Sequence, residues 1–126
     1  NLKKALIVHS QDGLDEISPY ANTDIVELTN GKITEFVLNP KDLGVKAGNF
    51  ENIIGKDPEY NAEKMKEIFG GKDNDFSVAV CLNAAAGLLV AEKSKSFKEG
   101  YQDLRKYILS GKVINHISKL VKWPIL

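Results

Sequence analysis

Apolar residues follow one spacing in the first third of this chain and another in its second half. Residues 4–9 form a short, apolar, β-rich run, and residues 24–29 and 32–38 form two further strand-like runs. The last two flank Asn30-Gly31, a pair that accepts the positive φ angles of a type I′ turn. The pattern therefore predicts a strand, a loop and a β-hairpin.

A short helix and an irregular segment are predicted after the hairpin. Asn39-Pro40 has the form of an N-cap followed by a proline in the first helical turn, and this helix should end near Gly44. Residues 45–60 contain glycine, asparagine and proline and are predicted to be irregular.

Helical spacing dominates the second half. A helix over residues 61–69 should begin at an Asn61 N-cap and end at the glycines that follow it. A second helix, over residues 76–93, should begin at an Asp75 N-cap. Because this second helix is apolar nearly all round, we expect it to be buried.

Two more helical stretches complete the chain. Residues 96–99 have the spacing of a capping box, with serine and glutamate three positions apart. Gly111 predicts a break, after which apolar residues at helical spacing continue to Val121. Trp123 and Pro124 are predicted to help hold the C-terminal tail in place.

The order of elements predicts an α/β chain with few strands for its helices. Three strands make a small sheet for four or five helices, and an apolar helix over residues 76–93 needs cover on every side. The chain also opens directly on a strand, without a starter methionine. We therefore expect part of a mixed-sheet domain, truncated from a larger one.

Composition narrows the class of protein. With 43% hydrophobic and 27% charged residues, the 126 residues suit one globular domain. Seventeen basic and 17 acidic side chains cancel, and no basic run is interleaved with aromatic residues, so nucleic-acid binding has no support. The apolar stretch 78–91 is too short to span a membrane. The lone cysteine, Cys81, suits a reducing compartment, so we expect a cytoplasmic location.

The most informative local feature is an acidic loop, residues 11–19, directly after the first strand. It contains Asp12, Asp15 and Glu16, and crowded carboxylates repel one another unless a cation or a proton joins them. Oxygen ligands without a nearby cysteine or histidine pair favour a hard cation, Mg2+ before Ca2+ or Mn2+. Mg2+ usually combines one or two protein carboxylates with water and substrate phosphates. The loop therefore suggests a Mg2+-phosphate site at the end of the first strand.

An inert loop is the alternative explanation of the same residues. Asp-Gly is a common turn pair, exposed acids are mostly solvated, and either Asp15 or Glu16 could merely favour a helix dipole. Elsewhere, His9 and His116 are interpreted as structural, and Cys81 as a small buried hydrophobe with an unreactive thiol. No residue of this chain is assigned a catalytic role.

The string from Val8 to Pro19, with Asp-Gly-Leu-Asp-Glu at its centre, resembles the C-terminal part of anthranilate phosphoribosyltransferase. The alanine-rich residues 82–86 and residues 109–112 are similar to two further segments of that family, and the resemblance extends through the whole chain. The order of elements agrees as well, including the hairpin after the acidic loop. Tyr20-Ala21-Asn22 departs from the expected threonine-glycine-proline but leaves the acidic pair untouched.

The resemblance implies a function for the loop. Residues 1–126 would be the C-terminal portion of an α/β domain, without the helical N-terminal domain and the first part of the α/β domain. The parent would be a cytoplasmic glycosyltransferase of tryptophan biosynthesis, usually a homodimer, that transfers phosphoribosyl from phosphoribosyl pyrophosphate to anthranilate. Asp15 and Glu16 would hold Mg2+ against the pyrophosphate. Because the family's glycine-rich diphosphate loop lies upstream, the fragment alone is expected to be inactive.

Two other functions stay open. A fragment of a pyrimidine-nucleoside phosphorylase would share the architecture, but it should lack the Asp15-Glu16 pair. A non-catalytic interaction domain would instead use an exposed apolar surface to bind a partner.

Overall fold

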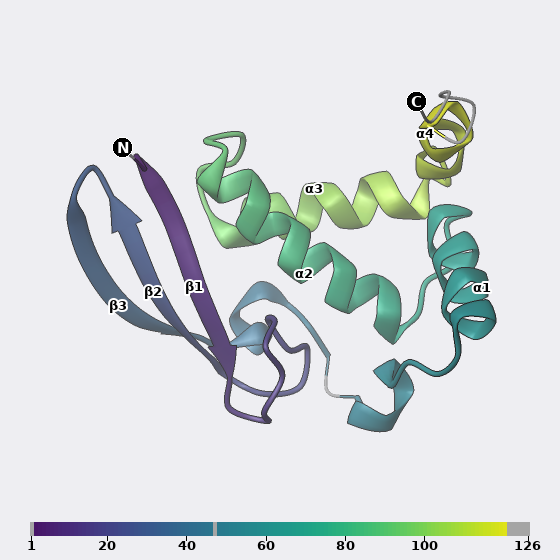
Figure 1. Ribbon diagram of the computed structural model, residues 1–126, viewed down its shortest axis with the longest axis horizontal. Coiled ribbons are helices and arrows are strands. Elements are labelled where there is room, and N and C mark those ends of the chain that lie inside the picture. The colour runs from purple at the N-terminus through teal and green to yellow at the C-terminus, as the bar shows by residue number, and fades with distance from the viewer. Residues whose placement is uncertain (1, 47, 121–126) are drawn as a thin grey trace.

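A three-stranded antiparallel sheet and a group of helices make up the computed structural model, which describes residues 2–46 and 48–120 (Figure 1). The strands lie in the order β1-β2-β3, and both pairings are antiparallel. The elements are β1 (Lys4–Ser10), β2 (Thr23–Thr29), β3 (Lys32–Leu38), α1 (Pro58–Phe69), α2 (Asp75–Val90), α3 (Phe97–Leu109) and α4 (Val113–Leu120). The predicted α/β class is confirmed. A mixed sheet stays a prediction for the larger domain, since the described strands pair only in the antiparallel sense.

The hairpin and the segment after it follow the sequence prediction. Asn30 and Gly31 form the turn between β2 and β3 with φ angles of 51° and 81°, as a type I′ turn requires. A 3-10 helix, Pro40–Leu43, follows with Asn39 as its N-cap and Gly44 as its C-cap. Because these signals depend on neighbouring residues alone, the local sequence was sufficient to predict them.

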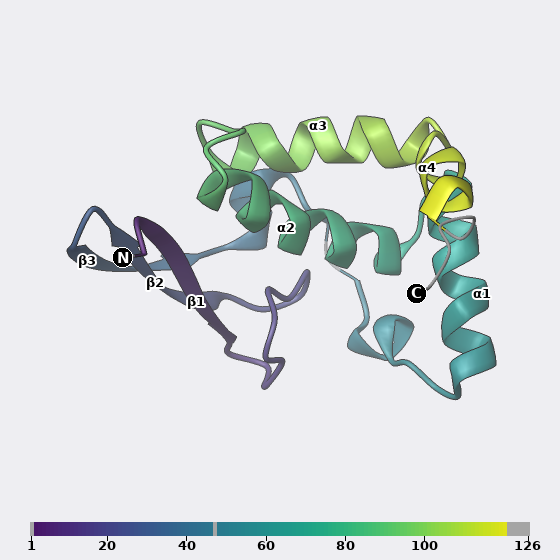
Figure 2. The ribbon, with the colours of Figure 1, turned by 45° about the horizontal axis from the view of Figure 1, so that its top comes forward.

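The two faces of the sheet differ in burial. On the inner face Ile25 is buried, and the ring of Phe36 meets Phe97 of α3 edge-on at a centroid distance of 6.4 Å. On the outer face Ile7, Ile33 and Val37 are 70%, 65% and 54% exposed. Figures 1 and 2 show the sheet beside the helices, with no helical layer on its outer face among the described residues.

The helix α2 carries much of the core and packs along α3 (Figure 2). Its buried face includes Cys81, Leu82 and Ala85. Where the two helices meet at Gly100 of α3, an added Cβ would lie 3.4 Å from the Cβ of Ala85. The small side chain of Ala85 therefore allows α3 to approach α2 closely at Gly100.

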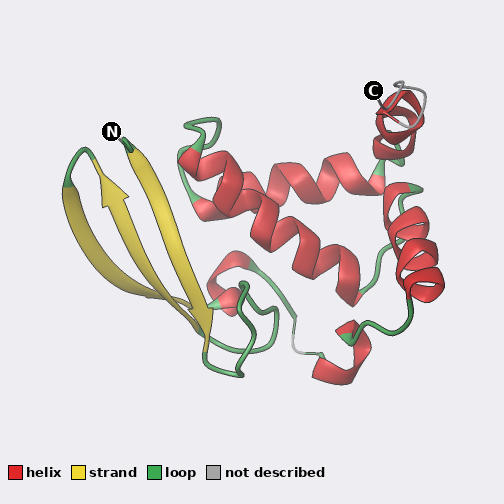
Figure 3. Ribbon diagram, in the orientation of Figure 1, coloured by secondary structure: helices red, strands yellow, loops and turns green. Residues whose placement is uncertain are grey.

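Three predicted features of the helices were wrong. The helix α1 begins at Pro58 with Asp57 as its N-cap, so Asn61 lies inside the helix and does not cap it. The predicted irregular segment contains the start of α1 and a 3-10 helix, Phe50–Ile53 (Figure 3). The predicted complete burial of α2 also fails, because Val80 on its outer side is 40% exposed.

Smaller corrections concern the helix ends. Asn74, one residue before the predicted Asp75, caps α2 in a reciprocal capping box with Ser77, and α2 ends at Val90. Ser96 caps α3 by accepting the amide of Glu99, but the Glu99 carboxylate turns to the amide of Lys95. The predicted break at Gly111 is confirmed, with a φ of 69° between α3 and α4. The predictions for Val121, Trp123 and Pro124 lie outside the described residues.

Candidate functional site

The acidic loop joins β1 to β2 and is closed at its base by backbone hydrogen bonds. The amide of Gln11 donates to the carbonyl of Asn22 at 2.8 Å, and the Ser10 hydroxyl donates to the same carbonyl at 3.3 Å. The amide of Ser10 donates to the carbonyl of Leu14 at 3.0 Å. The loop is therefore a compact Ω-loop whose two ends are held together at the end of the sheet.

Asp12 turns into this loop. Its carboxylate accepts a hydrogen bond from the Ser18 hydroxyl at 2.5 Å, and the Ser18 hydroxyl in turn accepts the amide of Tyr20 at 3.0 Å. Burial acts to raise the pKa of Asp12, but hydrogen bonds from Ser18, Ser10 and the amide of Leu14 outweigh it and lower that pKa. Asp12 thus stabilises the loop as an ionised internal acceptor.

Asn83 of α2 binds the backbone of the loop directly after Glu16. The amide of Ile17 donates to Oδ1 of Asn83 at 2.9 Å, and Nδ2 of Asn83 donates to the carbonyl of Ile17 at 2.9 Å. The same Nδ2 also donates to the carbonyl of Ala79 at 3.0 Å. Ile17 itself is only 1% exposed. Sequence reasoning did not assign Asn83 a role, although it is the polar residue that interrupts the apolar run of α2.

Asp15 and Glu16 are adjacent in sequence, and both are exposed on this anchored loop. Within residues 2–46 and 48–120, neither carboxylate makes a salt bridge. In the same part of the chain no group of three or more histidine, cysteine, aspartate or glutamate side chains could hold a metal ion. Two free carboxylates are nevertheless the donor set that Mg2+ commonly takes from a protein, with water and phosphate filling the other positions. The residues present therefore fit a Mg2+-phosphate site that phosphate would complete.

An apolar cavity of about 420 Å³ adjoins the acidic pair. Glu16, Ile17 and Asn83 line it on the loop side, and Ile53 and Phe76 line it with other apolar side chains. The carboxylate-bearing loop thus borders a surface that can accept apolar groups as well as polar ones.

A larger cavity, of about 810 Å³, is lined in part by Pro19 and Tyr20 at the end of the loop. Tyr20 contributes to its wall together with Asp75 and Arg105, and Arg105 forms an ion pair with Asp73. Burial raises the pKa of Tyr20, and the neighbouring carboxylate of Asp75 adds to this effect. Tyr20 is one of the three residues that depart from the loop sequence expected from the resemblance.

The remaining candidates do not join the acidic pair. His9 is exposed at the end of β1 and makes no side-chain hydrogen bond to a described residue, so the expected structural bond is not found. His116 is exposed on α4. Cys81 is fully buried, and burial raises the pKa of its thiol, which confirms the prediction of a small, unreactive hydrophobe.

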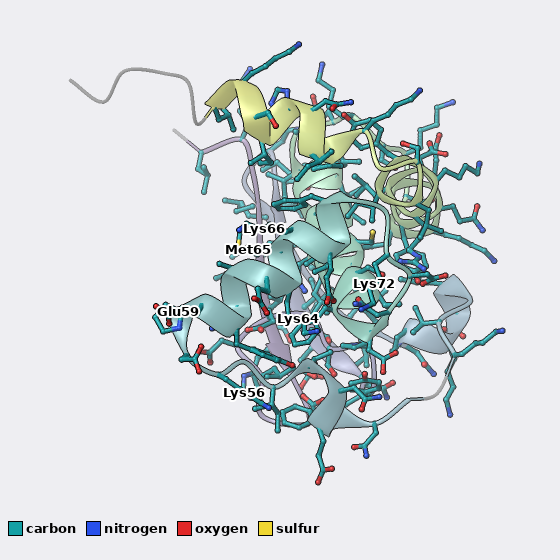
Figure 4. All side chains as sticks on the ribbon, turned by 90° about the vertical axis from the view of Figure 1, so that its right-hand side faces the viewer. Lys56, Glu59, Lys64, Met65, Lys66 and Lys72 are labelled. Atoms are coloured by element: carbon teal, nitrogen blue, oxygen red, sulfur yellow. The ribbon has the colours of Figure 1, made fainter. Side chains whose placement is uncertain are left out.

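A second group of charges lies on and beside α1 and is largely neutralised internally. Glu67 forms ion pairs with Lys64 at 3.1 Å and with Lys72 at 2.9 Å. Figure 4 shows Lys64 on one side of α1 and Met65 and Lys66 on the other. The acidic loop therefore remains the candidate site.

Residues 1–114 match the model of a protein family described as the glycosyl transferase family, a/b domain. The chain belongs to this glycosyl transferase family. Its resemblance to anthranilate phosphoribosyltransferase over part of that enzyme's length is thereby supported by an independent match to the α/β domain.

Relatives and solved structures agree with this assignment. The chain is 52% identical over 120 residues to the anthranilate phosphoribosyltransferase of Pelagibacter ubique (strain HTCC1062), a match that covers 95% of this chain and 36% of that protein. It superposes on the anthranilate phosphoribosyltransferase of Thermus thermophilus with a TM-score of 0.82 and 30% identity, covering 92% of this chain and 34% of the other. The resemblance inferred from the acidic loop is confirmed.

A yeast structure extends the comparison to a metal-bound form. The Ser121Ala variant of the Saccharomyces cerevisiae anthranilate phosphoribosyltransferase, described with Mg bound, matches with a TM-score of 0.80 and 25% identity, covering 91% of this chain and 34% of the other. This glycosyl transferase family chain thus spans about a third of the length of the relatives it matches. None of its described helices has the length and apolar character needed to cross a membrane.

Proposed function

We propose that this chain is the C-terminal portion of the α/β domain of an anthranilate phosphoribosyltransferase, in which Asp15 and Glu16 are ligands of Mg2+. The observation that carries the proposal is a pair of exposed carboxylates that form no salt bridge with the described residues, on a loop that is held at both of its ends. The 52% identity to the Pelagibacter ubique enzyme supports the choice of acceptor substrate. The yeast structure with Mg bound supports the choice of metal.

In the proposed reaction, the amino nitrogen of anthranilate forms a bond to C1 of phosphoribosyl pyrophosphate. The bond from C1 to the pyrophosphate oxygen breaks, and the nitrogen loses a proton. Bound Mg2+ would supply positive charge to the pyrophosphate as it leaves. Asp15 and Glu16 would hold the ion, and the anchored loop would keep both carboxylates at a fixed place while the amine approaches C1.

The chain supplies only part of this machinery. The resemblance places the glycine-rich diphosphate loop, and most residues that contact anthranilate, in segments upstream of these 126 residues. We therefore expect the fragment alone to be inactive, and the full-length enzyme to act as a cytoplasmic homodimer on phosphoribosyl pyrophosphate and anthranilate.

A Mg2+ titration of the full-length enzyme tests the assignment of the metal ligands. Asp15→Asn and Glu16→Gln remove one negative charge each but keep nearly the same shape. We expect each variant to need about tenfold more Mg2+ for half-maximal activity and to turn over more slowly, because ligand charge sets metal affinity. Folding should be unchanged, since both side chains are exposed.

The matched control is Glu35→Gln, which removes an exposed acid from β3. Its Mg2+ titration curve should coincide with that of the wild type. Unchanged curves for both loop variants would overturn the metal assignment.

An interaction domain is the second candidate function. The observation in its favour is the outer face of the sheet, where Ile7, Ile33 and Val37 are exposed together. This candidate predicts a defined complex and gives the acidic pair no role.

A further inference from the structure

The side chain of Asn83 is bonded to both backbone polar groups of Ile17. The carboxamide of Asn83 accepts from the amide of Ile17 and donates to its carbonyl, both at 2.9 Å. Its second N–H is taken by the carbonyl of Ala79 at 3.0 Å. Both donors and the acceptor are therefore engaged, and the orientation of the carboxamide is fixed by its partners.

The helix that carries Asn83 is a firm support. Asn74 and Ser77 close its first turn in a capping box, with hydrogen bonds of 2.9 Å and 3.1 Å. One position before Asn83, Leu82 is fully buried. The loop is thus tied to one of the best-packed elements of the molecule.

Ile17 is the residue next to the acidic pair. Its side chain is buried, and its amide and carbonyl both end on Asn83, while Asp15 and Glu16 just before it are exposed. A shift of the Ile17 backbone would therefore move Glu16 directly. The hydrogen bond between Ser18 and Asp12 also stabilises the loop, but both residues belong to the loop, so this bond does not connect it to α2.

We propose that Asn83 is a positioning residue for the metal site: it holds the loop backbone so that Asp15 and Glu16 share one ion. This inference rests on the proposed function of those two carboxylates. In this role Asn83 would act on the metal ligands through the backbone of Ile17, to which its side chain is bonded. Residues that orient metal ligands from behind typically change metal affinity 10- to 100-fold when they are removed.

The chain contains a matched control for this contact. Asn61 of α1 makes the same two-point contact with Lys56, accepting its amide at 3.0 Å and donating to its carbonyl at 3.2 Å. Removing the Asn61 side chain breaks the same two kinds of hydrogen bond to the backbone, but in a segment that carries no proposed metal ligand. Asn61→Ala therefore distinguishes a general loss of side chain–backbone contacts from a specific effect on the metal site.

The experiment compares four substitutions in the full-length enzyme: Asn83→Ala, Asn83→Asp, Asn61→Ala and the Asp15→Asn variant. Asn83→Asp keeps the volume of the side chain but replaces both donors with an acceptor that repels the two carbonyls. Activity is measured over a Mg2+ titration at saturating substrates, and hydrogen exchange is measured at the amide of Ile17. Thermal unfolding reports whether each variant is folded.

For both Asn83 variants we expect faster exchange at Ile17 and about a tenfold rise in half-saturating Mg2+. Most of the activity should return at high Mg2+, because the ligands themselves are retained. Asn61→Ala should leave the titration curve unchanged. This combination of results supports the proposal.

Other outcomes overturn it in distinguishable ways. If Asp15→Asn shifts the Mg2+ curve but neither Asn83 variant does, the positioning role is wrong while the metal assignment stands. If Asp15→Asn has no effect either, both are wrong. If neither Asn83 variant folds, Asn83 is a folding residue and the positioning role is rejected.

Discussion

At the scale of single residues, the acidic loop divides its carboxylates between two tasks. All three are exposed, but Asp12 accepts a hydrogen bond from Ser18 of the same loop, whereas Asp15 and Glu16 are unpaired among the described residues. A carboxylate that already accepts hydrogen bonds from protein donors is a poorer candidate for a metal than one that is free. The loop therefore uses one acid to fix its shape and leaves the other two available for the proposed ion.

The lowered pKa of Asp12 predicts a pH-dependent contribution to stability. A carboxyl whose pKa is lower in the folded state than its usual 3.8 stabilises the fold above that value, and the effect is lost as the pH falls through the folded pKa. Asp12→Asn should therefore lower the free energy of unfolding at pH 7 and at pH 5 by similar amounts. Denaturant unfolding of both proteins should show this difference shrinking only below pH 3.8. A difference that disappears between pH 7 and pH 5 would contradict the role given to Asp12.

At the scale of elements, the sequence was most informative where the signal and its effect are close together. Asn30-Gly31 specified the hairpin, and Asn39 with Gly44 specified the 3-10 helix between them. The start of α1 was misplaced because two good caps, Asp57 and Asn61, lie four positions apart. The proline that follows Asp57 favours the earlier start.

What the sequence did not reveal at the site depends on contacts between elements that are distant in sequence. The acidic pair could be found from its own residues, because its charge pattern is local. The role of Asn83 could not, because its partner Ile17 lies 66 positions away and the loop meets α2 only after the chain has folded. The exposure of Val80 was missed for the same reason, since apolar composition does not say which face of a helix lacks a neighbour.

The cap of α2 gives a test at this scale. Asn74→Ala should lower the free energy of unfolding by about 1 kcal/mol, because the amide of Ser77 loses its acceptor. Asn74→Gly should cost only a few tenths of a kcal/mol, since glycine is tolerated at an N-cap. Chemical denaturation of the two variants measures both effects. Equal costs for alanine and glycine would argue against Asn74 as the cap.

At the scale of the whole molecule, the helices in the described part of the chain cover only one face of the sheet. The inner face meets the helices through Ile25 and the Phe36–Phe97 contact, while Ile7, Ile33 and Val37 face outwards. An apolar face of this kind marks an interface or a tendency to associate. In the proposed full-length enzyme we expect other segments to cover it, and in an interaction domain a partner would do so.

The two functions therefore predict different behaviour of the isolated 126 residues in equilibrium sedimentation. If the chain is part of an enzyme, the outer face should drive polydisperse self-association, and no phosphoribosyl transfer should be detected in a steady-state assay. Ile33→Lys should reduce this association, because it places a positive charge on the apolar face. Thr34→Lys, at an exposed position on the opposite face of the same strand, is the control and should not. A single tight oligomer that Ile33→Lys abolishes would instead favour the interaction domain, because only a surface built for one partner gives one stoichiometry.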